Sequence, residues 1–117
     1  MRRRLSGLIP LPFSRPGEQY VSVGQLLFPV DYDVLLLGGR AIAGTAPQGA
    51  DLRAVVKLDG APFLTLTCLA GFASSGFVDG ANAPITAGSS FTVDVEQVGS
   101  TIPGSDLVIV LWMRSTP

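Results

Sequence analysis

The stretch ITAGSSFTVDVEQVGSTIPGSDLVIVLWM, residues 85–113, decides the fold of this chain. Apolar and polar residues alternate in FTVDVE at 91–96, and this period of two predicts a strand with one apolar and one polar face. The segment GSTIPGS at 99–105 is rich in residues that bend the chain and predicts a polar turn. The segment LVIVLWM at 107–113 is apolar throughout, so it predicts a second strand that needs cover on both faces.

The strand predicted at residues 107–113 has two apolar faces, because side chains alternate along a strand. We expect one face to line the core and the other to lie at least partly in a subunit interface. Burying a Val or Leu side chain stabilises by about 1.5–3 kcal/mol, and an aromatic side chain contributes more, so neither face is expected to stay in water. The core face is Leu107, Ile109, Leu111 and Met113, and the interface face is Val108, Val110 and Trp112.

The composition indicates an all-β protein. The chain has 117 residues, which suits one domain, and 47% of them are hydrophobic while only 15% are charged. The 14 glycines and 9 prolines recur at short intervals, which favours many short strands over long helices. We therefore expect an antiparallel β-sandwich, jelly-roll-like, with about seven or eight short strands.

Turn signals separate the other predicted strands. Asp59-Gly60 predicts a two-residue hairpin turn, because both residues can adopt positive φ. Gly38 and Gly39 indicate a bulge or a close backbone approach inside a strand. The remaining strands are expected within residues 20–28, 31–42, 52–58 and 61–68 and around residues 77–78.

Residues 1–18 are predicted to form an extended N-terminal arm, followed by the β-sandwich domain of residues 19–117. Three prolines prevent a regular helix in the arm, and its apolar side chains need a surface to cover them. Docking on the arm's own domain and docking on a neighbouring chain both remain open, and we favour the neighbour. The arm is basic and the rest of the chain acidic. The residues expected to bind the partner are Arg2, Arg3, Arg4, Leu8, Ile9 and Phe13.

The residue types exclude several kinds of site. The chain has no histidine, which excludes Ser-His-Asp and Cys-His catalysis and removes the commonest zinc ligand. Cys68 is the single cysteine, so it cannot form an intrachain disulfide, and its apolar surroundings indicate a buried thiol. The net charge of -1 gives no general attraction to nucleic acid or to a membrane. We expect no catalytic residue, metal or cofactor.

Two weaker signals leave alternatives open. Asp31 with Asp33, and Asp94 with Glu96, each share a strand face, and paired carboxylates serve Ca²⁺ sites and glycosidases. We favour a solvated face for both pairs. Trp112 offers a ring for stacking on a sugar, although an aromatic residue in an apolar strand is more often in a core or an interface.

Two segments of the chain resemble a small β-sandwich module of tailed-bacteriophage virion proteins. They are TAPQGADLRAVVKLDG at 45–60 and ITAGSSFTVDVEQVGSTIPGSDLVIVL at 85–111, and TVDVEQVGST with PGSDL is the distinctive part. The module is often found at the C-terminal end of tail fibres and in collar or neck proteins. Here the segment between the matched parts is short, and we expect no fibre shaft before the domain, which favours a free-standing virion component.

The resemblance implies a non-enzymatic virion structural protein, most simply a capsid decoration or cement protein that binds the shell through its N-terminal arm. Its partners would be the major capsid protein or tail proteins, and the subunit would form a homo-oligomer, with a trimer expected. The alternative is a tail-fibre, neck or receptor-binding module that contacts a host glycan or an adjacent tail protein. A carbohydrate-active enzyme is a more distant alternative.

Overall fold

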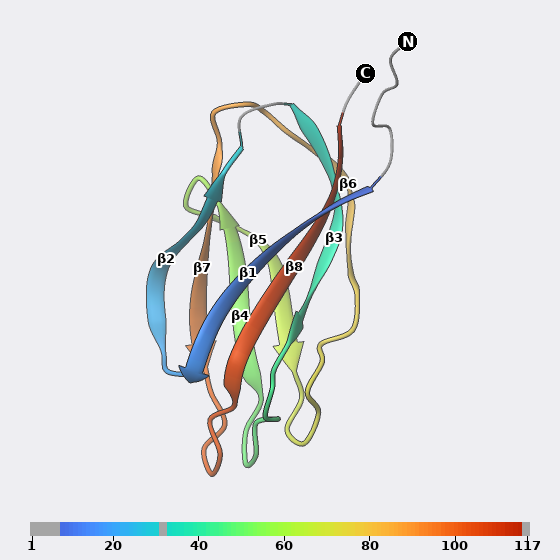
Figure 1. Cartoon of the computed structure of the whole chain (residues 1–117). Helices are drawn as coiled ribbons and strands as arrows, with labels where there is room; N and C mark the ends of the chain where they lie inside the picture. Colours follow the sequence, from blue (N-terminus) through green and yellow to red (C-terminus); the bar gives the residue numbers. More distant parts are fainter. Residues whose placement is uncertain (1–7, 31–32, 116–117) are drawn as a thin grey trace.

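The computed structural model describes residues 8–30 and 33–115. Within these residues it contains eight strands and no helix, which confirms the expected all-β fold (Figure 1). The strands are β1 Leu8–Glu18, β2 Ser22–Pro29, β3 Val34–Ile42, β4 Leu52–Leu58, β5 Ala61–Cys68, β6 Val78–Ile85, β7 Ser90–Gln97 and β8 Ser105–Ser115.

The strands form two four-stranded sheets in the orders β1-β8-β3-β6 and β2-β7-β4-β5. Each strand of the first half of the chain pairs antiparallel with one of the second half: β1 with β8, β2 with β7, β3 with β6 and β4 with β5. The chain is therefore one long hairpin wrapped into two layers, which is the jelly-roll arrangement. The expected antiparallel β-sandwich of jelly-roll type is confirmed.

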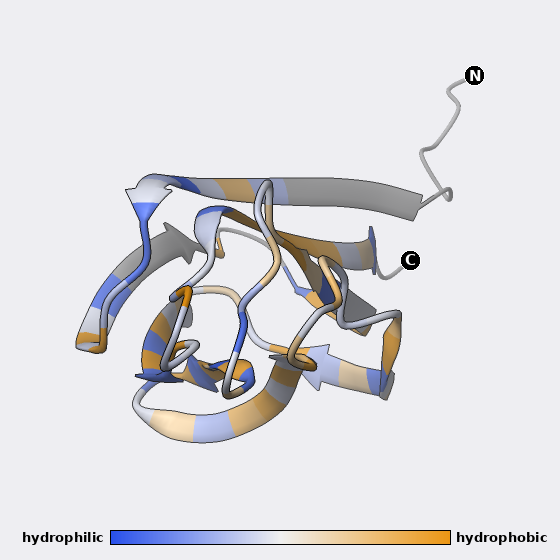
Figure 2. Cartoon of the chain, turned by 90° about the horizontal axis from the view of Figure 1, so that it is seen from below, coloured by the Kyte–Doolittle hydropathy of each residue, from blue (hydrophilic) through white to orange (hydrophobic). Residues whose placement is uncertain are grey.

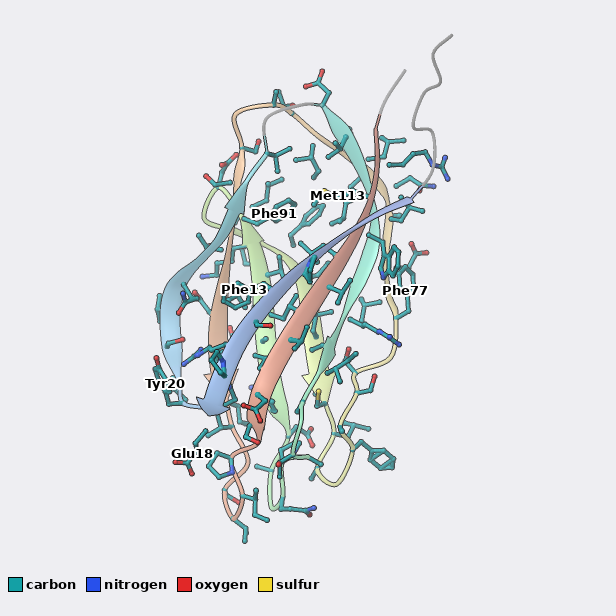
Figure 3. The ribbon with its side chains drawn as sticks, in the orientation of Figure 1. Phe13, Glu18, Tyr20, Phe77, Phe91 and Met113 are labelled. Atoms are coloured by element: carbon teal, nitrogen blue, oxygen red, sulfur yellow. The ribbon has the colours of Figure 1, made fainter. Side chains whose placement is uncertain are left out.

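The core lies between the two sheets, where the inward residues of both layers meet. Phe91 of β7 and Met113 of β8 are buried there, as Figure 3 shows. The expected core face of β8 is confirmed, because its inward residues are all buried while the residues between them are only half-buried. Hydrophobic and hydrophilic residues alternate along many strands, as the view in Figure 2 shows.

Two local expectations are confirmed. Asp59 and Gly60 have φ of 50° and 88° and join β4 to β5, so they form the predicted hairpin turn with positive φ at both positions. The register of β3 shifts between Leu36 and Gly38, which is the bulge indicated by the two glycines.

The polar turn after residue 97 joins strands of different sheets, because β7 pairs with β2 and β4 whereas β8 pairs with β1 and β3.

The predicted arm is wrong for residues 8–18, which form the edge strand β1 of the sandwich. β1 pairs along its length with β8, and Phe13, which we assigned to a partner surface, packs against the core of its own chain. The boundary at residue 18 therefore falls at the end of a strand of the sheet. Arg2, Arg3 and Arg4 lie outside the described residues, as do the side chains of Leu8 and Ile9.

The prolines of β1 explain why an apparent arm is a strand. Pro10 and Pro12 lie opposite Trp112 and Val110. Proline has no N–H, so the ladder to β8 requires the alternating residues to supply its hydrogen bonds. The backbone nitrogens of Pro10 and Pro12 are then directed to the free edge of the sheet, where no hydrogen bond of the ladder is lost.

Candidate functional site

The outer surface of the β1-β8-β3-β6 sheet carries the residues that the sequence assigned to an interface. Val108, Val110 and Trp112 project there and are half-buried, as are Leu35 and Ile42 of β3. These five residues are termed the apolar face below. The residues between them on β8 line the core, so the apolar face is turned away from the chain's own interior.

A glycine creates a special position beside Trp112. In the register of β3 and β8, Gly38 lies opposite Trp112. A Cβ atom at Gly38 would lie 2.5 Å from Cζ of Phe77, so the end of that ring covers the glycine. Phe77 is 57% exposed and its ring lies close to β3 (Figure 3). Trp112 and Phe77 therefore flank the bare backbone of Gly38.

Charged side chains border the apolar face. Arg40 lies opposite Val110 and is exposed, and Arg114 is exposed at the end of β8. Asp79 of β6 lies opposite Gly38 and is also exposed, with Oδ1 accepting a hydrogen bond of 2.7 Å from the Ala81 N–H. The described residues form two ion pairs, and neither includes any of these three charged groups.

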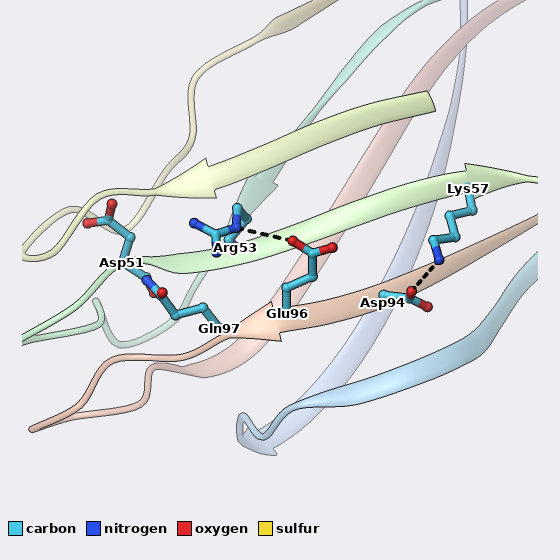
Figure 4. Close-up of polar contacts among 6 residues, drawn as sticks. All are labelled: Asp51, Arg53, Lys57, Asp94, Glu96 and Gln97. Carbon is cyan, nitrogen blue, oxygen red and sulfur yellow. Dashed lines mark hydrogen bonds and ion pairs between the residues drawn. The ribbon is translucent and has the colours of Figure 1, made fainter. Parts of the chain in front are cut away.

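The opposite outer surface, on the β2-β7-β4-β5 sheet, has a different character. Lys57 Nζ lies 2.6 Å from Asp94 Oδ2, and Arg53 Nε lies 3.3 Å from Glu96 Oε1 (Figure 4). Both pairs join β4 to β7 across the sheet. This surface is termed the polar face below, and its charges are paired within the chain.

Asp94 is the most constrained of the acids. Its residue is 6% exposed, and its Oδ1 accepts a 2.7 Å hydrogen bond from the N–H of Gly24 in β2. The hydrogen bond from Lys57, and then that from Gly24, hold the pKa of Asp94 below its usual value. The expected solvated acid pair is therefore wrong for Asp94, although Glu96 is exposed. Each carboxylate already has its own cation, which leaves no free pair for Ca²⁺ or hydrolysis.

Of the other acid pair, Asp33 alone can be placed. Asp31 lies outside the described residues, and Asp33 Oδ1 accepts a 2.9 Å hydrogen bond from the N–H of Ala87. This contact ties the chain before β3 to the chain between β6 and β7. Its geometry is that of a loop contact.

Arg15 lies within β1, in the part of the chain that the sequence predicted to be a basic arm, and it is buried. Only 6% of the residue is exposed. Its guanidinium donates to Ser22 Oγ at 2.8 Å and to the carbonyl of Tyr20 at 3.0 Å, and it lies 3.9 Å from the centre of the Tyr20 ring. The hydrogen bonds of this arginine therefore connect β1, at the edge of one sheet, to β2, at the edge of the other. Its guanidinium is not available to a partner.

Three loops meet at the end of the sandwich where β8 begins. Gln48 joins two of them, because its N–H donates to the carbonyl of Ile102 at 2.8 Å and its own carbonyl accepts from the N–H of Thr101 at 2.9 Å. The third loop is bound through the N–H of Gly71 and the carbonyl of Pro47. Exposed apolar side chains at this end, which the sequence reasoning missed, are Leu69, Phe72 and Ile102.

No catalytic or metal-binding cluster is found in the described part of the chain. Cys68 is fully buried, its Sγ lies 3.7 Å from the Ala41 carbonyl, and burial raises the pKa of its thiol. This confirms the interpretation of Cys68 as a buried, apolar-like residue. Residues 8–30 and 33–115 contain no group of three His, Cys, Asp or Glu side chains suited to a metal ion. The same residues contain no helix that could cross a membrane.

Comparisons with known proteins found no matching family model, no matching curated protein and no matching solved structure. The site is therefore judged on its own residues. The sequence identified Val108, Val110 and Trp112 by alternation, but it missed Arg40 and Phe77 beside them. Their positions depend on which strands are neighbours, and the only local signal was the Gly38-Gly39 pair.

Proposed function

We propose that this chain is a non-enzymatic structural subunit of a tailed-phage virion, where it decorates or cements the capsid shell. The observation that carries the proposal is the apolar face, which presents the single tryptophan of the chain on the outside of the sandwich. Its five side chains are half-buried, and the apolar surface that they leave in contact with solvent is of the kind that marks protein contacts. The similarity of residues 45–60 and 85–111 to phage virion modules supports the choice of assembly, and the jelly roll agrees with it by analogy only.

The first residues of the chain provide the second contact of the proposed subunit. Residues 8–18 form β1, so residues 1–7 are the part of the expected arm that we still assign to a partner. This segment contains Arg2, Arg3 and Arg4. We assign these arginines to acidic side chains of the major capsid protein, because Arg binds carboxylates through two parallel hydrogen bonds.

The number of copies in each particle tests the proposal. Quantitative mass spectrometry of purified virions, calibrated against the major capsid protein, is expected to find hundreds of copies of this chain. A few copies would place it in the tail instead, and absence from virions would refute the proposal. A chain that lacks residues 2–7 should fold, with an unchanged β-sheet spectrum, but should bind empty capsids more weakly than the full chain.

A second candidate function is recognition of a host glycan by a tail protein. The observation that favours it is the pair of aromatic rings, Trp112 and Phe77, on either side of Gly38. Aromatic rings pack against the apolar faces of sugars, and Arg40 lies beside them as a hydrogen-bond donor. Because Trp112 is the only tryptophan, its fluorescence reports on this place alone. A saturable change with host surface polysaccharide, lost in Phe77→Ala, would support this candidate over the first.

A further inference from the structure

We propose that the apolar face binds the same face of a second copy of this chain across a two-fold axis, with the two β8 strands antiparallel. The inference rests on the proposed function, because it names one partner of the surface that the proposed function uses. The occupant is argued from three observations: the state of the sheet edges, the order of residues across the face, and the positions of its charges.

The edges of this sheet are unsuited to pairing with another chain. β1 and β6 are its edge strands. On β1, Pro10 and Pro12 pair with Trp112 and Val110, and their backbone nitrogens have no hydrogen to donate at the free edge. On β6, Ala81 and Asn82 have φ of 58° and 53° and interrupt the extended backbone. A second copy therefore has the face of this sheet available to it, and not its edges.

The apolar face is self-complementary in its order along the strands. Residues that lie opposite one another on neighbouring strands form a row across the sheet. Trp112 of β8 belongs to one outward-facing row, and Val110 belongs to the next outward-facing row. A two-fold axis that runs across the strands, midway between these rows, exchanges them in a face-to-face pair. Val110 then lies over the partner subunit's Trp112, and Ile42 lies over the partner subunit's Leu35. The same rotation places Val108 over the partner subunit's Arg114, so the apolar contacts are those of Val110 with Trp112 and of Ile42 with Leu35.

The same rotation also places opposite charges together. Arg40 belongs to the row of Val110, and Asp79 belongs to the row of Trp112, on the next strand. The axis exchanges these two rows, so Arg40 meets the partner subunit's Asp79, and the symmetry forms this contact twice. A two-fold contact is isologous, and it is the type of interface that a single self-complementary surface produces. The pair differs from the trimer expected from the sequence.

The polar face cannot take this role, because its charges are already matched within the chain. Lys57 and Arg53 are bound to Asp94 and Glu96, and covering them would remove bound pairs from water for little gain. On the apolar face, covering the surface would remove apolar side chains from water, and Trp112 is the aromatic residue among them. Buried tryptophans are the residues that most often dominate binding at interfaces.

The first experiment is sedimentation equilibrium of the full chain over a range of concentrations, with Trp112 fluorescence recorded on the same samples. The wild-type chain is expected to form a dimer, and Trp112 emission is expected to shift to shorter wavelength as the dimer forms. Trp112→Ser should weaken the dimer by roughly 100-fold or more. The matched control is Glu96→Ser on the polar face, which should leave the dissociation constant unchanged.

The second experiment tests the predicted charge pair. Arg40→Glu and Asp79→Lys should each weaken the dimer by roughly tenfold, because each places like charges together across the axis. The double variant should return to within about threefold of the wild type. Asp79 also accepts from the Ala81 N–H, so Asp79→Asn is included, since it keeps an acceptor and removes the charge. Circular dichroism and thermal melts establish that each variant is folded.

The outcomes separate this inference from the proposed function. A wild-type monomer, a trimer, or charge reversals without rescue in the double variant would each overturn the two-fold pair. Monomers that are still incorporated into virions would overturn the pair and leave the proposed function standing. A dimer that behaves as described but is absent from virions would support the pair and refute the proposed function.

Discussion

The two outer faces of the sandwich differ in how their side chains are satisfied. On the polar face, Lys57 and Asp94 form an ion pair across two strands, and Asp94 also holds the backbone of β2. On the apolar face, Val110 lies beside Arg40, and neither ion pair of the described residues includes that arginine. The charges of the polar face are paired within the chain. The apolar face leaves apolar surface and charged groups that a partner can contact.

The same residue type is buried to different degrees on the two faces. Val55 of β4 and Val110 of β8 both project outward from the middle of a central strand. Val55 is 6% exposed and lies between Thr65 and Asp94 of the neighbouring strands, whereas Val110 is half-buried. Val110 therefore keeps more of its surface open to solvent than Val55 does.

The largest expected effect comes from breaking the polar face at Asp94. Asp94→Ala leaves Lys57 and the N–H of Gly24 without their acceptor, and we expect it to lower the free energy of unfolding by about 2–3 kcal/mol. Urea unfolding followed by circular dichroism measures this change. Glu96→Ala is the matched control, because its exposed pair with Arg53 is worth about 0–1 kcal/mol. Equal losses in the two variants would contradict the special role of Asp94.

On the apolar face, Gly38→Ala is expected to destabilise the fold by about 1–3 kcal/mol. Gly38 has φ of 154°, and an added Cβ would meet the Phe77 ring and the carbonyl oxygen of Val78. Thermal and urea unfolding measure the loss. Gly60→Ala is the control, since Gly60 also has positive φ but open space around it. A smaller loss at Gly38 than at Gly60 would show that the Phe77 ring moves aside freely.

The two valines provide a direct test of the difference between the faces. At low protein concentration, Val55→Ala should cost about 1–2 kcal/mol more in unfolding free energy than Val110→Ala, because the former removes buried methyl groups. If a second copy covers Val110, the cost of Val110→Ala should increase with protein concentration, since association stabilises the folded state. A cost at Val110 that is high and independent of concentration would mean that its own chain already covers it.

The smallest effect is expected from acid. The pKa of Asp94 is lowered in the folded chain, so its contribution to stability is present above the unfolded pKa and is lost as the pH falls through the folded pKa. The stability difference between wild type and Asp94→Asn should therefore stay constant from pH 7 to about pH 5 and narrow below about pH 4. Urea unfolding at each pH measures it. A difference that grows on acidification would contradict the assigned direction.

The accuracy of the sequence analysis depended on how local each signal was. The turn at Asp59-Gly60 and the division of β8 into inner and outer residues depend on neighbouring residues, and both were predicted. The roles of Phe13 and Arg15 were not, because their surroundings come from strands far along the chain. Three prolines among apolar residues indicated an arm. Only the pairing of β1 with β8 showed that two of these prolines occupy positions where no backbone hydrogen-bond donor is required.

By itself, the sequence determined the all-β class, the jelly-roll-like sandwich and the alternation that places Trp112 opposite the core. These properties follow from backbone periodicity and turn chemistry, which act over a few residues. The tertiary structure alone decided that β1 completes a sheet, that Asp94 is buried beside Lys57, and that Arg40 and Phe77 border Trp112. The physical reason is register: the neighbours of a side chain across a sheet are set by which strands pair and at which residue, and that depends on the packing of the whole chain.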